Sequence, residues 1–284
     1  MSVPEPEIRA LSQALFGMAK WASRLALTSE VVALVFSARL AIARAPEWTS
    51  VPLLALLALV TFLFRGLADA WRDQADEQLR KLDLADGLGR PISARDCADL
   101  MANAPRLAVW LSRRRPAESY FASASTGSPR RLVENLRESA WWTWHLGRTA
   151  EWLQKVWLIV FGTFGVGTLA MQAIRPGGFS GGFLTKPSLA VALLLFLFTS
   201  GPYGRLGKFR SLHEAAHDVE MKAGHLLDHP ERIDESKALL LAGDYHLARK
   251  GAPLLSSLVW RLRKAELNRL WGGVARGPAD PMGA

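Results

Sequence analysis

The chain has 284 residues, of which half are apolar and only 21% are Asp, Glu, Lys or Arg. Soluble domains usually carry more charge, so this composition indicates apolar segments set in a polar chain. The single cysteine, Cys97, excludes an intrachain disulfide and a cysteine-rich metal site. The formal net charge of +9 suits nucleic acid, anionic lipid or an acidic small molecule as partner, although Lys and Arg also accumulate on the cytoplasmic segments of membrane proteins.

Four apolar runs predict an all-α integral membrane protein with four transmembrane helices, arranged as two hairpins plus a helical cytoplasmic region. Fourteen Lys or Arg lie between the hairpins and thirteen follow the second hairpin, whereas the two hairpin turns carry three, so the long segments are expected in the cytoplasm. The predicted parts are a cytoplasmic N-terminal segment (1–24), a first transmembrane hairpin (25–64), a cytoplasmic helical domain (65–152), a second transmembrane hairpin (153–200) and a cytoplasmic C-terminal helical region (201–284).

The first hairpin contains two apolar runs of unequal quality. Val51 to Phe64 is densely apolar and reaches spanning length only when residues 48–50 are added. Leu25 to Ile42 has to accommodate Glu30 and Arg39. Charged side chains in a membrane segment either extend toward water near a helix end or face a bundle interior or a pore. Glu30 and Arg39 are therefore candidate pore or interhelical contacts.

The cytoplasmic helical domain carries two basic groups. Ser128 followed by Pro129 predicts the start of a long helix beside the second group, because Ser caps helices and Pro is tolerated in the first turn. Guanidinium groups bind phosphates through paired hydrogen bonds. A charge run is equally typical of a solvated surface or of one that meets lipid head groups. The candidate contacts to nucleotide phosphates are Arg113, Arg114, Arg115, Arg130 and Arg131.

Val156 to Ile174 is the clearest span, with nineteen residues and no charge. As a helix it extends about 28 Å, close to the hydrocarbon thickness of a bilayer. Thr163, Thr168 and Gln172 within it are further candidate pore or interhelical polar contacts. A connection rich in Gly and Pro separates this run from the next one, at about residues 183–200, so the two runs predict the second hairpin.

Tryptophans crowd the entrance to this span. Indole rings favour the membrane interface, which is one explanation of the group, and packing against a cytoplasmic helix is the competing explanation for its first three members. The group consists of Trp141, Trp142, Trp144, Trp152 and Trp157.

The C-terminal region is predicted to be helical, with Asp234 capping one of its helices. It contains the string His213-Glu214-Ala215-Ala216-His217. Histidines four apart on a helix share a zinc ion in metalloproteases, while the intervening Glu acts as a base. Against this reading, Asp218 follows the string and no third ligand stands at a diagnostic spacing. His213 and His217 are the alternative metal ligands, and ordinary half-buried histidines are the competing interpretation.

Two further strings stand out: Arg131-Leu-Val-Glu-Asn-Leu-Arg-Glu-Ser-Ala-Trp-Trp-Thr before the third span, and Asp244-Tyr-His-Leu-Ala-Arg-Lys-Gly-Ala-Pro-Leu-Leu near the tail. With the layout of two apolar hairpins around a helical insert, they resemble the SMODS-associated four-transmembrane effector family of bacterial cyclic-oligonucleotide (CBASS-type) anti-phage defence. The likeness covers nearly the whole chain in layout. It does not include the His-Glu-x-x-His string.

The resemblance implies an effector that is not an enzyme and needs no cofactor. A partner nucleotidyltransferase would make a cyclic or linear oligonucleotide messenger, the cytoplasmic part would bind it, and oligomerised membrane helices would breach the bacterial inner membrane. The implied partners are the lipid bilayer, the messenger and further copies of the chain, with no DNA or RNA polymer. The implied location is the inner membrane, multi-pass, with both termini cytoplasmic.

Two alternatives stay open. One is a zinc-dependent membrane protease that uses the His213-Glu214-Ala215-Ala216-His217 string, with His213, Glu214 and His217 as its working residues. The other is a passive membrane scaffold or transporter subunit.

Overall fold

The structure is a computed structural model that describes residues 5–43, 51–114, 127–174 and 202–275. These residues form eight α-helices, one 3-10 turn (Pro230–Arg232) and no strand, which confirms the all-α prediction. The helices are, in chain order, α1 (Glu5–Ala43), α2 (Val51–Leu88), α3 (Ala94–Ala102), α4 (Arg106–Ser112), α5 (Pro129–Ile174), α7 (Pro202–Asp228), α8 (Glu235–Lys250) and α9 (Ser257–Ala275).

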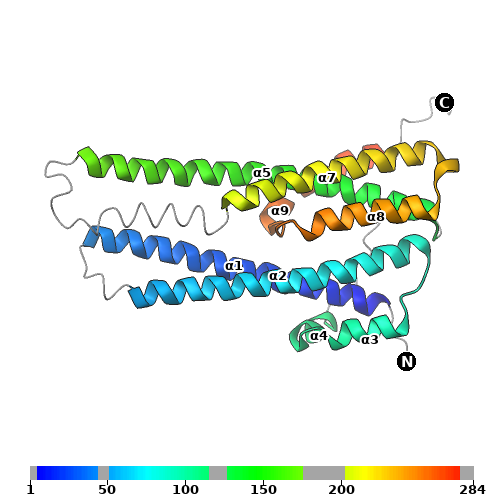
Figure 1. The fold of residues 1–284 in the computed structure, drawn as a ribbon, viewed down its shortest axis with the longest axis horizontal. Coiled ribbons are helices and arrows are strands. Elements are labelled where there is room, and N and C mark those ends of the chain that lie inside the picture. Colours follow the sequence, from blue (N-terminus) through cyan, green and yellow to red (C-terminus); the bar gives the residue numbers. More distant parts are fainter. Residues whose placement is uncertain (1–4, 44–50, 115–126, 175–201, 276–284) are drawn as a thin grey trace.

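Two long helical hairpins run side by side through the molecule (Figure 1). In the first, α1 packs antiparallel against α2, and the short α4 lies against α1. In the second, α5 packs antiparallel against α7, while α8 returns against both of them. Contacts from α2 to α5 and α8 join the two hairpins. The fold is therefore a pair of hairpins, each with its own short helices.

The helices begin where capping chemistry predicts. The Ser128 hydroxyl accepts a hydrogen bond from the Arg131 backbone N–H (3.3 Å) just before Pro129 opens α5. The Asp234 carboxylate accepts one from the Lys237 backbone N–H (2.8 Å) at the start of α8. Both predicted helix starts are confirmed. From this start, α5 continues without a break into the run predicted as the third span.

One end of the molecule has the buried core of a soluble helical bundle. Its main cluster joins α5, α7 and α8, and a second cluster joins α1, α2 and α4. Each large side chain fully buried in this way stabilises the fold by about 1.5–3 kcal/mol. The largest fully buried members are Tyr245, Leu132, Leu136, Val133, Val219, Leu11 and Leu15.

The tryptophans of α5 divide between this core and the surface. Trp141 lies 5.2 Å from Trp271 and Trp142 lies 5.3 Å from Trp260, measured between ring centroids, so both pack against α9. Trp144 stacks on a histidine of α7. Packing against neighbouring helices, and not a position at a membrane interface, thus accounts for these three rings. Trp152 and Trp157 are exposed.

The opposite end, which holds the C-terminal part of α1, the N-terminal half of α2 and the C-terminal half of α5 (Figure 1, left), has the reverse pattern. Its large apolar side chains point outward: Phe62 is 73% exposed, Ile159 67% and Val35 62%. Others of this apolar surface are Leu27, Val31, Val32, Leu53, Leu56, Leu59, Leu63, Val156, Trp157 and Val160.

Among the described residues, one helix is long and apolar enough to cross a membrane, α2 from Pro52 onward, and little of its apolar part is buried. The predicted first and third spans lie within α1 and α5, two unbroken helices. The predicted fourth span, residues 183–200, lies outside the described residues. Four spans are therefore not confirmed, and the second arm of the predicted second transmembrane hairpin lies outside the described residues.

Candidate functional site

A buried ion pair joins α1 and α2 at the boundary between the core and the apolar surface. Glu30, only 6% exposed, pairs with Arg65 of α2. Beside it, the Ser29 hydroxyl donates to the Leu57 carbonyl (3.0 Å). A buried carboxylate without a cation would be strongly unfavourable, so the pair fixes the register of the two helices. The structure thus places Glu30 in a contact between two helices of one chain.

The other polar residues predicted to make contacts in the pore or between helices are less informative. Thr163 is exposed on α5. Arg39, Thr168 and Gln172 lie in α1 and α5, but their side chains are outside the described part of the chain.

The first basic group follows α4 and is open to solvent. Arg113 and Arg114 are both exposed, and the Arg114 guanidinium lies over the Trp110 ring, 3.7 Å from its centroid. Trp110 itself is 48% exposed. Arg115 lies outside the described residues. This patch of a half-exposed indole beside two arginines can stack a planar group and bind an anion, and sequence reasoning missed the contribution of Trp110.

The second basic group serves the packing of α5. Arg130 pairs with Glu134 one turn along the helix (3.0 Å). Arg131 donates to Asp86 of α2 (3.0 Å), and Asn135 donates to the same carboxylate (2.9 Å). Both arginines are thus engaged with acids, whereas no acid among the described residues pairs with Arg113 or Arg114. The two groups do not form one phosphate site in the described part of the chain.

The histidines of the zinc-protease string both face α5. His213 Nε2 lies 2.8 Å from Glu151 Oε2, and Lys155 pairs with the same carboxylate. His217 stacks on Trp144 with ring centroids 4.2 Å apart. Within the described ranges no three His, Cys, Asp or Glu side chains gather closely enough to hold a metal ion. The structure therefore uses these histidines as helix-packing residues, and it offers the zinc alternative no third ligand there.

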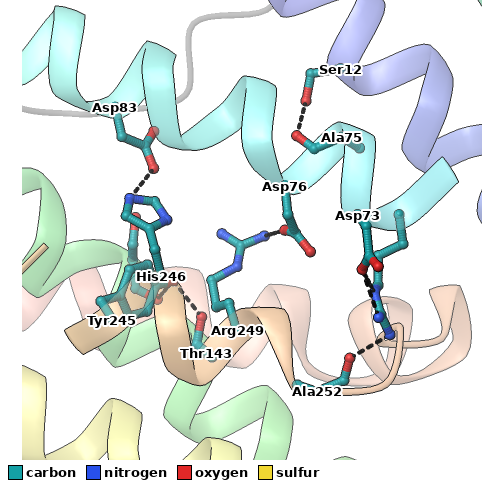
Figure 2. A network of polar contacts seen from close by, with 12 residues as sticks. Ser12, Asp73, Ala75, Asp76, Asp83, Thr143, Tyr245, His246, Arg249 and Ala252 are labelled. Atoms are coloured by element: carbon teal, nitrogen blue, oxygen red, sulfur yellow. Dashed lines mark hydrogen bonds and ion pairs between the residues drawn. The ribbon is translucent and has the colours of Figure 1, made fainter. Parts of the chain in front are cut away.

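Charged residues also line the seam between the two hairpins (Figure 2). On α2, Asp76, Asp83 and Asp86 follow one another at helical spacings of seven and three, so they share a face. Their partners come from the second hairpin: Arg249 of α8 donates to Asp76 (3.1 Å), and Arg131 of α5 donates to Asp86. We define the polar joint as these five residues together with Asn135, Tyr245 and His246.

Asp83 and His246 form the most deeply buried pair of the joint, with side chains 5% and 10% exposed and 3.6 Å between Oδ2 and Nε2. Removal from water raises the pKa of Asp83 to about 7, although Arg249 and Arg9 oppose the rise. Burial, helped by Arg249, lowers the pKa of His246 to about 3. At pH 5 the pair therefore holds one proton, and it resides on the carboxyl group.

Tyr245 secures the joint to α5. It is 1% exposed, and its hydroxyl donates to the Ser139 carbonyl (3.1 Å) and shares a hydrogen bond with Thr143 (2.8 Å). Where α8 ends, Arg72 of α2 donates a hydrogen bond to the Ala252 carbonyl (2.8 Å). Figure 2 shows Tyr245 next to the Asp83–His246 pair, and Ala252 farther along the seam, beyond Arg249 and Asp76.

The polar joint was not predicted from the sequence, although the sequence contains a signal for it. The two strings that carry the family resemblance, residues 131–143 and 244–255, supply every joint residue of the second hairpin. They lie a hundred residues apart in the chain and meet in space at α2. The joint residues that they supply are held by contacts between helices.

No family model, curated protein or solved structure matches the chain.

Proposed function

We propose that this chain is a multi-pass bacterial inner-membrane effector that binds an oligonucleotide messenger in the cytoplasm, self-associates and permeabilises the membrane. The observation that carries the proposal is the apolar surface at one end of the two hairpins. Large aliphatic side chains from α1, α2 and α5 face outward there, while the other end buries an ordinary core. Moving each such side chain from water into hydrocarbon gains about 1–3 kcal/mol, so lipid is the solvent that suits this end.

The residues near the edge of the apolar surface support a cytoplasmic position for the core. Trp21 meets Phe64 edge-on, with ring centroids 5.9 Å apart, and Trp152 is exposed on α5. Arg24 and Lys155 are exposed near these rings in sequence. Aromatic rings with cations on the cytoplasmic side are typical of a membrane boundary. A fourth span within residues 183–200 would return the chain to the cytoplasm before α7.

We assign the messenger contact to Trp110, Arg113 and Arg114, because they combine a half-exposed indole with exposed guanidinium groups. A nucleobase stacks on an indole, and phosphates accept paired hydrogen bonds from arginine. Since α4 packs against α1, a ligand held there acts directly on a helix that continues into the apolar surface. Binding shifts the chain toward the assembled state only if that state holds the messenger more tightly.

Dye release from liposomes tests the proposal. The full chain is reconstituted with carboxyfluorescein inside, and a panel of cyclic di- and trinucleotides is added. We expect release with at least one nucleotide, and loss of the response in Trp110→Ala and in the Arg113→Ala, Arg114→Ala double variant. Arg261→Ala, an exposed arginine of α9, is the matched control and should respond normally.

Two results would contradict the proposal. If the purified chain stays folded and dispersed without detergent and does not bind vesicles, the membrane assignment fails. If vesicles take up the chain but no nucleotide releases dye, a passive scaffold or transporter subunit becomes the better reading.

A further inference from the structure

One face of α1 changes from basic to apolar where the helix enters the apolar surface. Lys20 and Arg24 are followed on this face by three exposed aliphatic side chains. The successive spacings of four, three, four and four residues keep all five positions on one side of a helix. The aliphatic residues are Leu27, Val31 and Val35, which are 50%, 41% and 62% exposed. The face thus has a charged end and a longer apolar end.

The two cations of this face are not neutralised by an acid. Arg24 donates to the Ser257 hydroxyl at the start of α9 (2.9 Å), and no carboxylate in the described ranges forms an ion pair with Arg24 or Lys20. Lys20 is half-buried, and its burial, together with repulsion from Arg24, lowers the pKa of its ammonium group. A base that only followed the cytoplasmic excess of Lys and Arg would extend into water. A half-buried cation next to a second cation therefore points to a bound anion.

The position of the cations on α1 selects the kind of anion. Trp21, which lies between them in sequence, meets Phe64 edge-on at the edge of the apolar surface, where we place the membrane boundary. Lys and Arg at this depth attract the anionic head groups of the cytoplasmic leaflet. The Ser257 hydroxyl can donate a further hydrogen bond to a phosphate, because it accepts one from Arg24 and keeps its own proton.

The apolar part of the face has the length of an acyl chain. Val35 lies eleven residues beyond Arg24, which is about 16 Å along the helix axis. Half of the hydrocarbon core of a bilayer is about 15 Å thick. An acyl chain attached to a head group at Arg24 would therefore pass all three aliphatic side chains, whereas a soluble anion would leave them uncovered.

We propose that this face of α1 binds one anionic phospholipid of the cytoplasmic leaflet. The lipid phosphate accepts hydrogen bonds from Lys20, Arg24 and Ser257, and one acyl chain lies along the aliphatic residues of the face. Because α9 packs on α5 through Trp271, the bound lipid connects α1 of the first hairpin to a helix held by the second. The proposal rests on the membrane assignment of the proposed function, but it uses none of the residues assigned to the messenger.

Native mass spectrometry of the full chain in detergent micelles tests the proposal, with phosphatidylglycerol as the anionic probe and phosphatidylcholine as the neutral one. We expect one phosphatidylglycerol to be retained per chain, with an affinity about tenfold or more above that of phosphatidylcholine. The Lys20→Met, Arg24→Gln double variant, which removes both charges and keeps long side chains, should abolish this preference. The Arg95→Met, Arg106→Gln double variant removes two charges at exposed positions of α3 and α4 and should bind like the wild type.

Glycerol 3-phosphate, a phosphate without acyl chains, distinguishes a lipid from a soluble anion. It should displace phosphatidylglycerol only at concentrations about a hundredfold higher, since it does not cover the apolar part of the face. Displacement at equal concentrations would overturn the lipid in favour of a soluble phosphate. Equal retention of the two phospholipids by the wild type would also overturn the proposal, as would an unchanged preference in the Lys20→Met, Arg24→Gln variant.

The membrane assignment is tested separately, by uptake of the chain into vesicles of pure phosphatidylcholine. A chain that enters these vesicles but shows no preference for phosphatidylglycerol refutes the lipid site alone. A chain that does not bind vesicles refutes the membrane assignment, and the lipid site with it.

Discussion

The Asp83–His246 pair makes a sharp prediction about pH. In the unfolded chain the pair binds one proton between the ordinary pKa values of the two groups, and that proton lies on the histidine. In the folded chain the pair also binds one proton between about pH 3 and 7, but it lies on Asp83. Because folding leaves the proton count unchanged near pH 5, the pair adds little pH dependence to the wild-type stability.

When either residue is substituted, the stability of the variant should depend on the titration of the partner that remains. The two variants should show pH dependences of opposite sign. In His246→Gln, Asp83 keeps a raised pKa, so its contribution to stability is complete below pH 3.8 and disappears as the pH rises to about 7. In Asp83→Asn, His246 keeps a lowered pKa, so its contribution is complete above pH 6.5 and is lost as the pH falls toward 3. Each effect has a slope of about 1.4 kcal/mol per pH unit within its window.

Between pH 7 and pH 5, we therefore expect His246→Gln to gain on the order of 2–3 kcal/mol relative to wild type and Asp83→Asn to lose about 2 kcal/mol. Denaturant unfolding of the full chain in micelles at pH 5, 6 and 7, followed by tryptophan fluorescence, measures both slopes. The His225→Gln variant, which changes an exposed histidine of α7, serves as the control. Slopes of the same sign in the two variants, or no slope in either, would refute the proton assignment.

Three further predictions concern charge. Arg249→Met should lower the free energy of unfolding by about 3 kcal/mol, measured by the same denaturant unfolding, because it leaves the carboxylate of Asp76 buried without its cation. Glu30→Leu and Arg65→Leu should each be strongly destabilising, and the double variant should recover most of the loss, which a double-mutant cycle quantifies. Phe62→Lys should oppose membrane insertion by about 2–3 kcal/mol and shift the chain from the membrane fraction, whereas no shift would argue that this face does not meet lipid.

The sequence predicted the helical class and several helix starts because these depend on local chemistry. Ser128 and Asp234 cap their helices through contacts within one turn, and such contacts can be read from adjacent residues. The interpretation of Arg131 as a phosphate contact is different, because its environment depends on Asp86, 45 residues earlier. A pattern search along the chain cannot find that partner.

The difference between local and distant contacts also explains why the roles of the histidine string and of Trp110 could not be predicted. The spacing of His213 and His217 is compatible with zinc, but their neighbours on α5 decide what the rings contact. Trp110 gives no local signal of function; only its exposure and its stacking with Arg114 make it a candidate. The apolar surface was the easiest feature to predict, since a long apolar run needs no partner to be recognised.

The contacts between the hairpins differ in kind from those within them. Inside each hairpin, apolar clusters hold the helices together, whereas the seam combines the charged polar joint with apolar contacts from Leu84 and Leu88. When the seam opens, the charged hydrogen bonds of the polar joint are replaced by hydrogen bonds to water, so the net change in free energy is modest. Opening an apolar core instead costs about 25 cal/mol for each Å² of apolar surface exposed. The hairpins should therefore shift along the polar joint before either one unpacks. In the proposed effector, variants of Asp83 and His246 should change the nucleotide concentration that releases dye, and the apparent nucleotide affinity should shift in the same direction, because binding and assembly are linked.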